Sequence, residues 1–383
     1  MKIIVDDNIP FGNEMFSTLG DVLSSDGREI TQVKVKDADV LIVRSITKVD
    51  ESLLKESAVK FVGTVTIGFD HIDINYLRKR NIPFESAPGS NSNSVAEYVI
   101  CALLATVNKL NINLKDLTLG IIGVGNIGSK VEKKTHALKM NVLLNDPPLY
   151  DLTGDNKYRP LEELISCCDI ITYHIPLTKK GKYPTYHMIN YEFLSRLKKK
   201  PIIINTSRGQ IASTNDLKKA LDSGYISNVI LDVWENEPNI DTELLKMSLL
   251  GTPHIAGHSL DGKVNGAYMI YQSLCQHLKK NPVWDPKDNL PKSNVPIITI
   301  EKLSNSLEKN LFNVLSQVYN IEKDSLMLRK IINLPVEKQG NYFENLRKKY
   351  RVRREFFNTE VLLKDKNTDL VNILNGLGFM IAY

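Results

Sequence analysis

The sequence has few cysteines, no long apolar segment and little excess charge of either sign, and each shortage excludes a class of protein. Its 383 residues include four cysteines without a CxxC pair, which argues against a disulfide framework and predicts that no structural zinc is bound. No segment approaches the roughly 20 apolar residues of a membrane-spanning helix, and the N-terminus lacks the pattern of a signal peptide. We therefore expect a cytoplasmic protein that does not bind membranes. The formal net charge of +5 is too small to predict nucleic-acid binding.

Short apolar runs alternate with amphipathic stretches through the first 280 residues, a pattern typical of parallel sheets flanked by helices. Val95, Val99, Leu103 and Val107 recur at helical spacing and predict a helix over 94–110. The runs expected to form strands are 3–5, 40–43, 61–64, 119–122, 141–144, 170–173, 202–205 and 229–231.

A glycine motif follows one of these strands directly and opens a helical pattern. Gly123, Gly125 and Gly128 form a GxGxxG motif, with Asn126 and Ile127 between the last two glycines. The first glycine permits a tight turn, the second lets a pyrophosphate approach the backbone, and the third allows the helix to pack closely on the sheet. Amide groups at the helix N-terminus then face the phosphates. The motif predicts a dinucleotide site, although a plain strand-to-helix turn is the alternative for these glycines taken alone.

An acidic residue at the end of the next strand favours the dinucleotide interpretation. Asp146 follows the run 141–144 and lies about 20 residues beyond the glycines, where a carboxylate can accept hydrogen bonds from ribose hydroxyls. A carboxylate there also repels a 2′-phosphate. We therefore expect NAD rather than NADP.

The late position of the glycine motif indicates two lobes. The helix over 94–110 would carry the chain from a first lobe into the dinucleotide lobe, and a helix over 262–280 would bring it back. We expect an α/β protein with two Rossmann/flavodoxin-like doubly wound lobes, a cleft between them suited to hinge closure, and a small C-terminal α+β domain after a proline-rich segment at 284–296. The predicted domains are a discontinuous substrate-binding lobe (1–93 and 258–285), an NAD-binding Rossmann domain (94–257) and a C-terminal domain (290–383).

The side chains that could bind and react with an acid substrate come after predicted strands of the second lobe. Arg208 comes after the run 202–205, at the edge of the sheet where ligands bind, and its guanidinium can grip a carboxylate with two parallel hydrogen bonds. His254 is a candidate base for a hydroxyl proton, and Glu237 is our choice for the carboxylate that orients its ring. A surface arginine in a turn is the alternative for Arg208. The other histidines are expected to be structural because the sequence shows no carboxylate partner for them; they are His71, His136, His174, His187 and His277.

Together these residues resemble the D-isomer-specific 2-hydroxyacid dehydrogenases. Within that family the similarity is closest to the members that oxidise 4-phosphoerythronate, and it spans almost the whole chain. The segments that carry this similarity are 5–10 (VDDNIP), 43–49 (VRSITKV), 61–64 (FVGT), 70–73 (DHID), 145–148 (NDPP), 254–257 (HIAG) and 262–263 (GK).

The resemblance implies NAD-dependent oxidation of 4-phosphoerythronate at its second carbon, giving 2-oxo-3-hydroxy-4-phosphobutanoate, a step towards pyridoxal phosphate. It implies that Arg208 and Glu237 are active-site residues and that His254 is the acid/base. It further implies NAD contacts at Asp146, Ile175, Asp232 and Gly257, and substrate contacts at Ser45, Thr66 and His258. Arg44, next to Ser45, could add positive charge for an anionic substrate. No metal is implied.

Some of these positions have alternatives or depart from the family pattern. A helix-capping role is the alternative for Asp232, and a solvated surface position is the alternative for the first-lobe residues. Relatives carry tyrosine where His258 stands and threonine where Ile175 stands. His258 can still donate a hydrogen bond, whereas Ile175 can offer only its backbone.

The C-terminal segment shows no glycine motif and no nucleophile with a visible partner. Relatives use such a segment to form a dimer, so we expect a homodimer. Its dense basic run, 347–354, is interpreted as a solvated face, with recruitment of the substrate phosphate across the dimer as the alternative.

Two other functions are compatible with these residues. A dehydrogenase for another 2-hydroxy acid, such as 3-phosphoglycerate, would keep the same catalytic residues. A non-enzymatic protein that senses NAD and recruits a partner would keep the glycine motif but would not need Arg208, Glu237 and His254 together.

Overall fold

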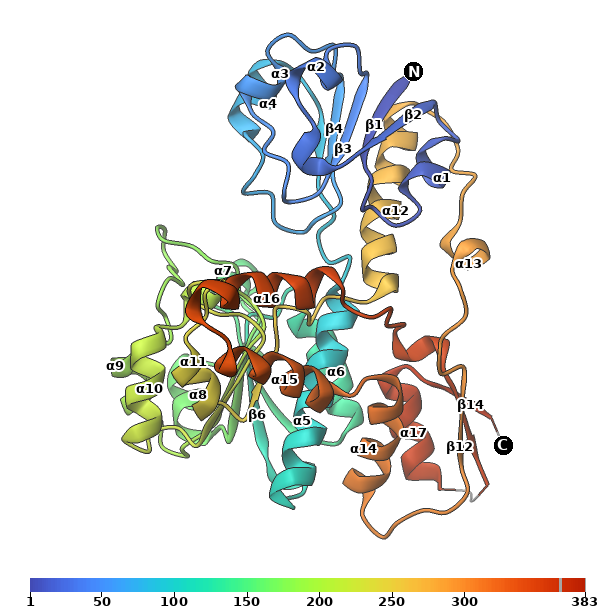
Figure 1. Cartoon of the computed structure of the whole chain (residues 1–383). Helices are drawn as coiled ribbons and strands as arrows, with labels where there is room; N and C mark the ends of the chain where they lie inside the picture. The colour runs from blue at the N-terminus through green and yellow to red at the C-terminus, as the bar shows by residue number, and fades with distance from the viewer. Residues whose placement is uncertain (365–366, 383) are drawn as a thin grey trace. The chain divides into compact units, whose positions relative to one another are not determined.

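The computed structural model describes residues 1–364 and 367–382, which form two compact units. The first comprises Met1–Asn91 and Ser259–Lys292, and the second comprises Ser92–His258 and Ser293–Tyr383 (Figure 1). The C-terminal segment thus belongs to the same unit as the glycine motif. The three-domain division and the cleft expected between the lobes stay predictions.

The first unit is built on a five-stranded sheet in which every pairing is parallel, in the order β2-β1-β3-β4-β5. This is the flavodoxin-like order of doubly wound folds. The strands are β1 (Lys2–Asp6), β2 (Asp21–Ser25), β3 (Val40–Val43), β4 (Phe61–Thr64) and β5 (Phe84–Glu85). The helices are α1 (Gly12–Phe16), α2 (Gln32–Val35), α3 (Glu51–Leu54), α4 (Ile74–Lys79), α12 (Leu260–His277) and α13 (Pro286–Asn289).

Both faces of this sheet are buried, which explains why its central strands are continuous apolar runs. Side chains such as Ile3 and Ile42 pack towards α1 and α12, whereas their neighbours Ile4 and Leu41 pack towards α2, α3 and α4. Successive residues of a strand therefore supply two separate cores.

The second unit contains a six-stranded sheet, also parallel throughout, in the order β11-β10-β9-β8-β6-β7. The chain winds in both directions from β6, so the topological switch point, where ligands bind in such sheets, falls at the ends of β6 and β8. The strands are β6 (Thr118–Ile122), β7 (Asn141–Asn145), β8 (Ile170–Tyr173), β9 (Ile202–Asn205), β10 (Asn228–Leu231) and β11 (Leu250–Gly251).

Helices cover both faces of this sheet as well. On one face α5 and α6 pack against residues such as Ile121 and Ile204, and on the other α8 to α11 pack against residues such as Ile122 and Ile203. The helices are α5 (Ser92–Leu110), α6 (Gly128–Ala137), α7 (Pro147–Thr153), α8 (Leu161–Cys167), α9 (Tyr191–Ser195), α10 (Thr214–Asp222) and α11 (Thr242–Met247).

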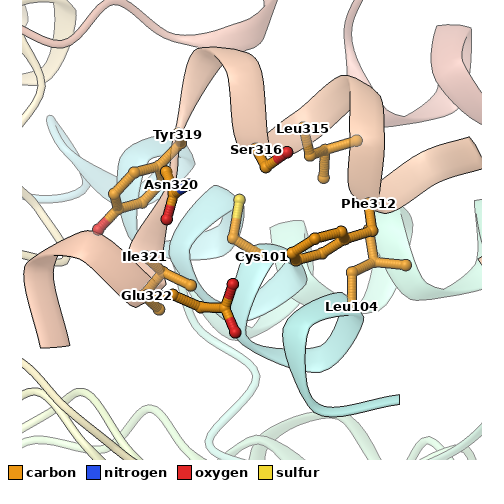
Figure 2. A pocket seen from close by; sticks show the side chains of 9 residues that line it. All are labelled: Cys101, Leu104, Phe312, Leu315, Ser316, Tyr319, Asn320, Ile321 and Glu322. Atoms are coloured by element: carbon orange, nitrogen blue, oxygen red, sulfur yellow. The ribbon is translucent and has the colours of Figure 1, made fainter. Parts of the chain in front are cut away.

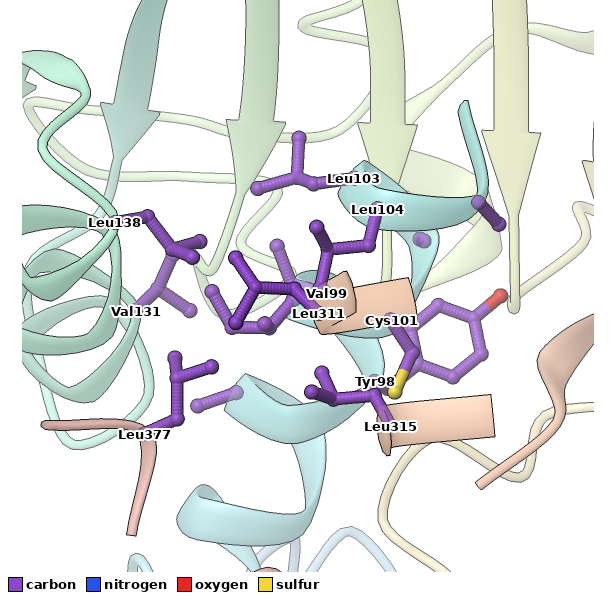
Figure 3. Close-up of a cluster of buried hydrophobic side chains, with 14 of the residues drawn as sticks. Tyr98, Val99, Cys101, Leu103, Leu104, Val131, Leu138, Leu311, Leu315 and Leu377 are labelled. Atoms are coloured by element: carbon purple, nitrogen blue, oxygen red, sulfur yellow. The ribbon is translucent and has the colours of Figure 1, made fainter. Parts of the chain in front are cut away.

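In its described residues, the C-terminal segment adds a small parallel sheet, β12-β13-β14, and the α-helices α14 to α17. Figure 3 shows apolar side chains of α5, α6, α14 and α17 meeting in one cluster, which is continuous with the core on that face of the large sheet. The elements are β12 (Ile297–Ile300), α14 (Leu307–Val318), α15 (Ile321–Arg329), α16 (Val336–Lys348), β13 (Glu360–Leu363), α17 (Thr368–Leu377) and β14 (Met380–Ala382).

A buried group of charged residues also fastens the C-terminal segment to α5. Arg353 donates to Glu97 Oε2 at 3.1 Å, and both side chains are almost fully buried (1% and 0% exposed). Ser94 Oγ, on the same helix, donates to Glu355 Oε1 at 2.5 Å. The Arg353 guanidinium also lies over the Tyr319 ring, 4.1 Å from its centroid. These contacts correct the interpretation of the basic run as a solvated face at two of its residues, because Arg353 and Arg354 are 3% and 8% exposed, whereas Lys348, Lys349 and Arg351 are exposed.

The predicted α/β fold is confirmed, and every strand expected before residue 232 is present. The helix expected over 94–110 spans Ser92–Leu110, and the helix expected over 262–280 spans Leu260–His277. Strand β2 was not predicted because it lies at the sheet edge and three of its five residues are exposed, so it lacks an apolar run. No helix in the described part of the chain is long and apolar enough to cross a membrane.

Replacing Arg353 by methionine should strongly destabilise the protein. The change leaves the Glu97 carboxylate buried without its cation, and breaking a buried pair in this way costs about 3–5 kcal/mol. The free energy of unfolding, measured by urea titration, should fall by that amount in Arg353→Met and remain near the wild-type value in Lys246→Met, which breaks an exposed pair on α11. Equal stabilities of the two variants would contradict the role assigned to this group.

Candidate active site

The glycine loop has the geometry that a dinucleotide site requires. Gly123 adopts a φ of +88°, and a Cβ on it would lie 2.5 Å from the His174 carbonyl oxygen, so a side chain is excluded on two grounds. A Cβ on Gly128 would lie 2.0 Å from the Gly123 carbonyl oxygen. A Cβ on Gly125, in contrast, would meet no atom within 4 Å, which is open space beside the N-terminus of α6. Close packing thus requires glycine at the first and third positions, and the second glycine leaves room for a pyrophosphate.

The residues around this loop include other predicted cofactor contacts. Asn126 is exposed and Ile127 is half-buried. The Ile175 side chain lies against the glycine loop, with its Cγ2 2.6 Å from the position of a Cβ on Gly123. Asp146 Oδ2 accepts a hydrogen bond from the Val124 amide at 2.8 Å, while Oδ1 caps α7. Asp146 is therefore part of the loop's own structure and is only half-buried.

His254 and Glu237 form the imidazole–carboxylate pair expected from the sequence. His254 Nδ1 and Glu237 Oε2 are 2.8 Å apart, and the side chains are 34% and 20% exposed. Burial raises the pKa of Glu237, but the hydrogen bond and charge of His254, the Trp234 amide and the charge of Arg347 together lower it below the ordinary value. The carboxylate is therefore ionised and must accept from Nδ1–H, which makes Nε2 the atom of the neutral ring that can accept a proton.

Backbone contacts hold His254 in an unusual conformation. Its φ is +55°, which costs a non-glycine residue about 1–3 kcal/mol. The His254 amide donates to the Asp232 carbonyl at 2.7 Å. The Asp232 carboxylate accepts from the next two amides, those of Ile255 and Ala256, at 2.8 and 2.9 Å. Asp232 thus fixes the loop that carries the imidazole.

The Asp232 side chain is 1% exposed, and one of its oxygens also accepts from Thr252 Oγ1 at 2.6 Å. Burial is the largest effect on it and raises its pKa despite these hydrogen bonds. Its contact with NAD stays a prediction. The Gly257 backbone, half-buried at the end of the same loop, also stays a predicted cofactor contact.

Trp234 links all three predicted catalytic residues. Its amide donates to Glu237 Oε1 at 2.8 Å, and its indole Nε1 donates to the carbonyl of Thr252, two residues before His254, at 3.0 Å. Gly209, which follows Arg208, approaches the Trp234 backbone so closely that a Cβ would lie 1.9 Å from the carbonyl oxygen. The loops that carry Arg208, Glu237 and His254 therefore meet at one buried residue.

Arg208 begins a short 3-10 turn, Gly209–Ile211, and its side chain is exposed. Its Nη1 donates to the Ser207 carbonyl at 2.8 Å, and it forms no ion pair with any residue that the structure describes. Most of the guanidinium fork thus remains available to an anionic ligand.

A second imidazole–carboxylate pair was not predicted. His187 Nε2 lies 2.7 Å from Glu235 Oε1, which corrects the expectation that His187 has no carboxylate partner. His136 likewise lies 3.9 Å from Glu132. The His187 ring is stacked on Tyr186, with centroids 4.1 Å apart. His174 is buried, and burial lowers its pKa to about 3, so it is neutral.

The predicted substrate residues of the first unit lie at the ends of β3 and β4. Arg44 Nε donates to the buried Asp6 at 2.9 Å, and Ser45 next to it is exposed. Thr66 is half-buried, and its hydroxyl donates to the Gly68 carbonyl at 2.8 Å. Their contact with substrate stays a prediction. His258, in the second unit, lies edge-on to the Tyr350 ring, with centroids 6.0 Å apart.

A separate small pocket lies between α5 and the C-terminal helices. Figure 2 shows Cys101 and Phe312 among the side chains that line it. Its volume of about 10 Å³ is roughly the space for one water molecule, so it is a gap between helices and not a substrate site. No cluster of three or more residues suited to hold a metal ion is found in residues 1–364 and 367–382.

Comparison with known sequences shows which family the region around the site resembles. The family described as D-isomer specific 2-hydroxyacid dehydrogenase, NAD binding domain, matches residues 105–256. A second family, described as Domain of unknown function (DUF3410), matches residues 289–378. Erythronate-4-phosphate dehydrogenase of Proteus mirabilis is 41% identical over 380 residues, which cover 99% of each chain. The enzyme of the same name from Bacteroides thetaiotaomicron is 42% identical over 356 residues, covering 93% of this chain and 97% of the relative.

Solved structures are similar to a large part of the chain. D-Lactate dehydrogenase from Aquifex aeolicus, complexed with NAD and lactic acid, is 28% identical with a TM-score of 0.57, covering 73% of this chain and 96% of that one. NAD-bound 3-phosphoglycerate dehydrogenase from Entamoeba histolytica is 27% identical with a TM-score of 0.60, covering 73% and 95%.

The parallel sheets, the glycine loop and the His254–Glu237 pair define an NAD-dependent dehydrogenase of 2-hydroxy acids, as these comparisons also indicate. Within that class, the chain belongs to the erythronate-4-phosphate dehydrogenase family, because its relatives match at 41% and 42% identity over nearly the whole length.

Two features of the site were missed from the sequence. The linking role of Trp234 depends on its backbone amide, its carbonyl and its indole N–H, and only the position of a tryptophan after a strand could have drawn attention to it. The His187–Glu235 pair joins residues 48 positions apart and has no motif of its own.

The two imidazole–carboxylate pairs provide a matched test of the assigned base. We expect His254→Ala to retain NAD binding while kcat falls by about 10²–10⁴-fold, the usual contribution of a general base. His187→Ala removes an imidazole with a similar partner and should change kcat by less than about 5-fold. Steady-state kinetics and NADH fluorescence titration measure the two properties separately. Normal turnover in His254→Ala, or a larger loss in His187→Ala, would reassign the base.

Proposed function

We propose that this protein oxidises 4-phosphoerythronate to 2-oxo-3-hydroxy-4-phosphobutanoate with NAD as hydride acceptor, a step towards pyridoxal phosphate. The similarity to erythronate-4-phosphate dehydrogenases over nearly the whole chain supports the substrate. The single structural observation that carries the chemistry is the 2.8 Å contact between His254 Nδ1 and Glu237 Oε2. It leaves the opposite ring nitrogen as a base for a hydroxyl proton.

The residues of the glycine loop fit NAD. Gly125 leaves open space where a side chain would block a pyrophosphate, and the N-terminus of α6 follows directly. Asp146, half-buried at the end of β7, is the group that would face the adenosine ribose. When bound, NAD supplies the hydride acceptor.

The protein side chains then divide the remaining work. His254 Nε2 removes the proton from the C2 hydroxyl as the hydride leaves the same carbon, so an alcohol becomes a ketone and one proton remains on the imidazole. The ionised Glu237 carboxylate holds the ring and stabilises the resulting imidazolium. The exposed guanidinium of Arg208 binds the C1 carboxylate by two hydrogen bonds.

We infer that the protein is a homodimer joined through its C-terminal segment. Several large apolar side chains are exposed in that segment, as expected for a surface that is covered by a second copy. They are Ile297, Leu326, Val336, Val352, Phe357 and Met380.

A substrate panel tests the proposed reaction. After removal of copurified cofactor, NADH formation should show a kcat/KM for 4-phosphoerythronate that exceeds the value for 3-phosphoglycerate by about 100-fold. D-Lactate serves as the unphosphorylated comparison. A preference for 3-phosphoglycerate would indicate the dehydrogenase of another hydroxy acid, and no turnover with any acid would indicate a non-enzymatic NAD-binding protein.

A further inference from the structure

The C-terminal helix α16 and the residues after it run along the loops that carry the catalytic pair. Near the middle of α16, a Cβ on Gly340 would lie 2.6 Å from Asn239 Oδ1 and 3.4 Å from Pro238 Cγ, so the helix touches the residues directly after Glu237. Beyond the end of the helix, Tyr350 contacts the ring of His258. Both contacts lie within the second unit.

Arg347 lies between these two contacts and on the face of α16 that is turned to the catalytic loops. Residues seven positions apart share a face of an α-helix, so Arg347 extends from the same face as Gly340. Arg347 is half-buried, and its positive charge contributes to lowering the pKa of Glu237. This contribution is the smallest of those that lower the pKa of Glu237, so the Arg347 guanidinium lies near the catalytic pair but is not what keeps Glu237 ionised.

Arg347 differs from the other arginines of the basic run because, in the described part of the chain, no hydrogen bond or ion pair holds its guanidinium. Arg351 is paired with Asp324, Arg353 with Glu97, and the Arg354 guanidinium donates to Asn358. The Arg347 Nε is buried without a hydrogen-bond partner, and Arg347 forms no ion pair within residues 1–364 and 367–382. A partly buried cation in this state has lost hydration without compensation, which an anionic ligand would restore.

We propose that Arg347 is a specificity-determining residue that binds the phosphate group of the substrate in the active site of its own chain. This proposal rests on the proposed function, and it gives the C-terminal segment a direct part in catalysis. Arg208 and the His254–Glu237 pair act on the carboxylate and the C2 hydroxyl, which every 2-hydroxy acid carries. The phosphate needs a further cation, and a guanidinium fork matches its oxygens.

The test compares phosphorylated and unphosphorylated substrates in Arg347→Met. We expect KM for 4-phosphoerythronate to rise by about 10- to 100-fold, as for the loss of a charged hydrogen bond, while kcat/KM for erythronate changes by less than about 2-fold. Arg347→Lys keeps the charge without the fork and should recover part of the loss. Both Arg347 variants should keep the wild-type melting temperature and NADH affinity. If Arg347 had only a structural role, its replacement would lower these values.

Lys348→Met is the matched control, because Lys348 is the next residue on α16 and is exposed. It should leave both substrates unaffected within about 2-fold, since a solvated lysine contributes only a weak, screened field. The proposal would be overturned if Arg347→Met and Lys348→Met lowered kcat/KM for 4-phosphoerythronate equally. It would also be overturned if Arg347→Met lowered kcat/KM equally for erythronate and 4-phosphoerythronate.

The outcome is separable from that of the proposed function. If the wild-type protein oxidises 3-phosphoglycerate and not 4-phosphoerythronate, the proposed substrate is wrong. The same comparison is then made with 3-phosphoglycerate and glycerate. A selective loss on 3-phosphoglycerate in Arg347→Met supports the phosphate site, and a loss on both acids rejects it.

Discussion

The catalytic part of this protein depends on the close approach of three loops to the buried residue Trp234. Its amide is bound by Glu237, its indole N–H is bound just before His254, and its carbonyl leaves no room for a side chain at Gly209. Trp234 makes these contacts through its amide, its carbonyl and its indole ring. One loop therefore cannot shift without disturbing its contact with Trp234 and, through it, the other two loops. The site is preorganised in this sense, and a displacement of about 1 Å in such an arrangement is known to reduce catalysis strongly.

The two carboxylates near this residue, the buried Asp232 and the half-buried Glu237, have different tasks. Asp232 accepts hydrogen bonds from amides and a hydroxyl and so fixes the shape of the loop. Glu237 accepts a hydrogen bond from the Trp234 amide at one oxygen and contacts the imidazole with the other. Burial raises the pKa of Asp232, while the pKa of Glu237 is lowered although burial opposes this. The carboxylate whose pKa is lowered, Glu237, is the one that contacts the imidazole, as an imidazolium-stabilising role requires.

Much of the fold and part of the site could be predicted from the sequence, for physical reasons that particular residues illustrate. Strands such as β3 and β9 are buried on both faces, so four successive apolar residues mark β3 and three mark β9. The glycine motif is local, and the open space at Gly125 is what its spacing predicts.

Two kinds of feature could not be predicted from the sequence: contacts between side chains that are distant in the chain, and a strand at the exposed edge of a sheet. Glu97 and Arg353 are 256 residues apart, and only their burial together shows that the end of the basic run is not a solvated face. The His187–Glu235 pair was missed for the same reason. The edge strand β2 was missed because solvent exposure removes the apolar pattern that identifies a strand.

The assigned roles of His254 and Arg208 can be observed in a crystal structure of the complex with NADH and 2-oxo-3-hydroxy-4-phosphobutanoate. We expect His254 Nε2 within hydrogen-bond distance of the C2 oxygen, about 2.6–3.2 Å, with Nδ1 still on Glu237 and the Arg208 fork on the C1 carboxylate. A C2 oxygen bound to His187, or an Arg208 side chain turned away from the carboxylate, would contradict these roles.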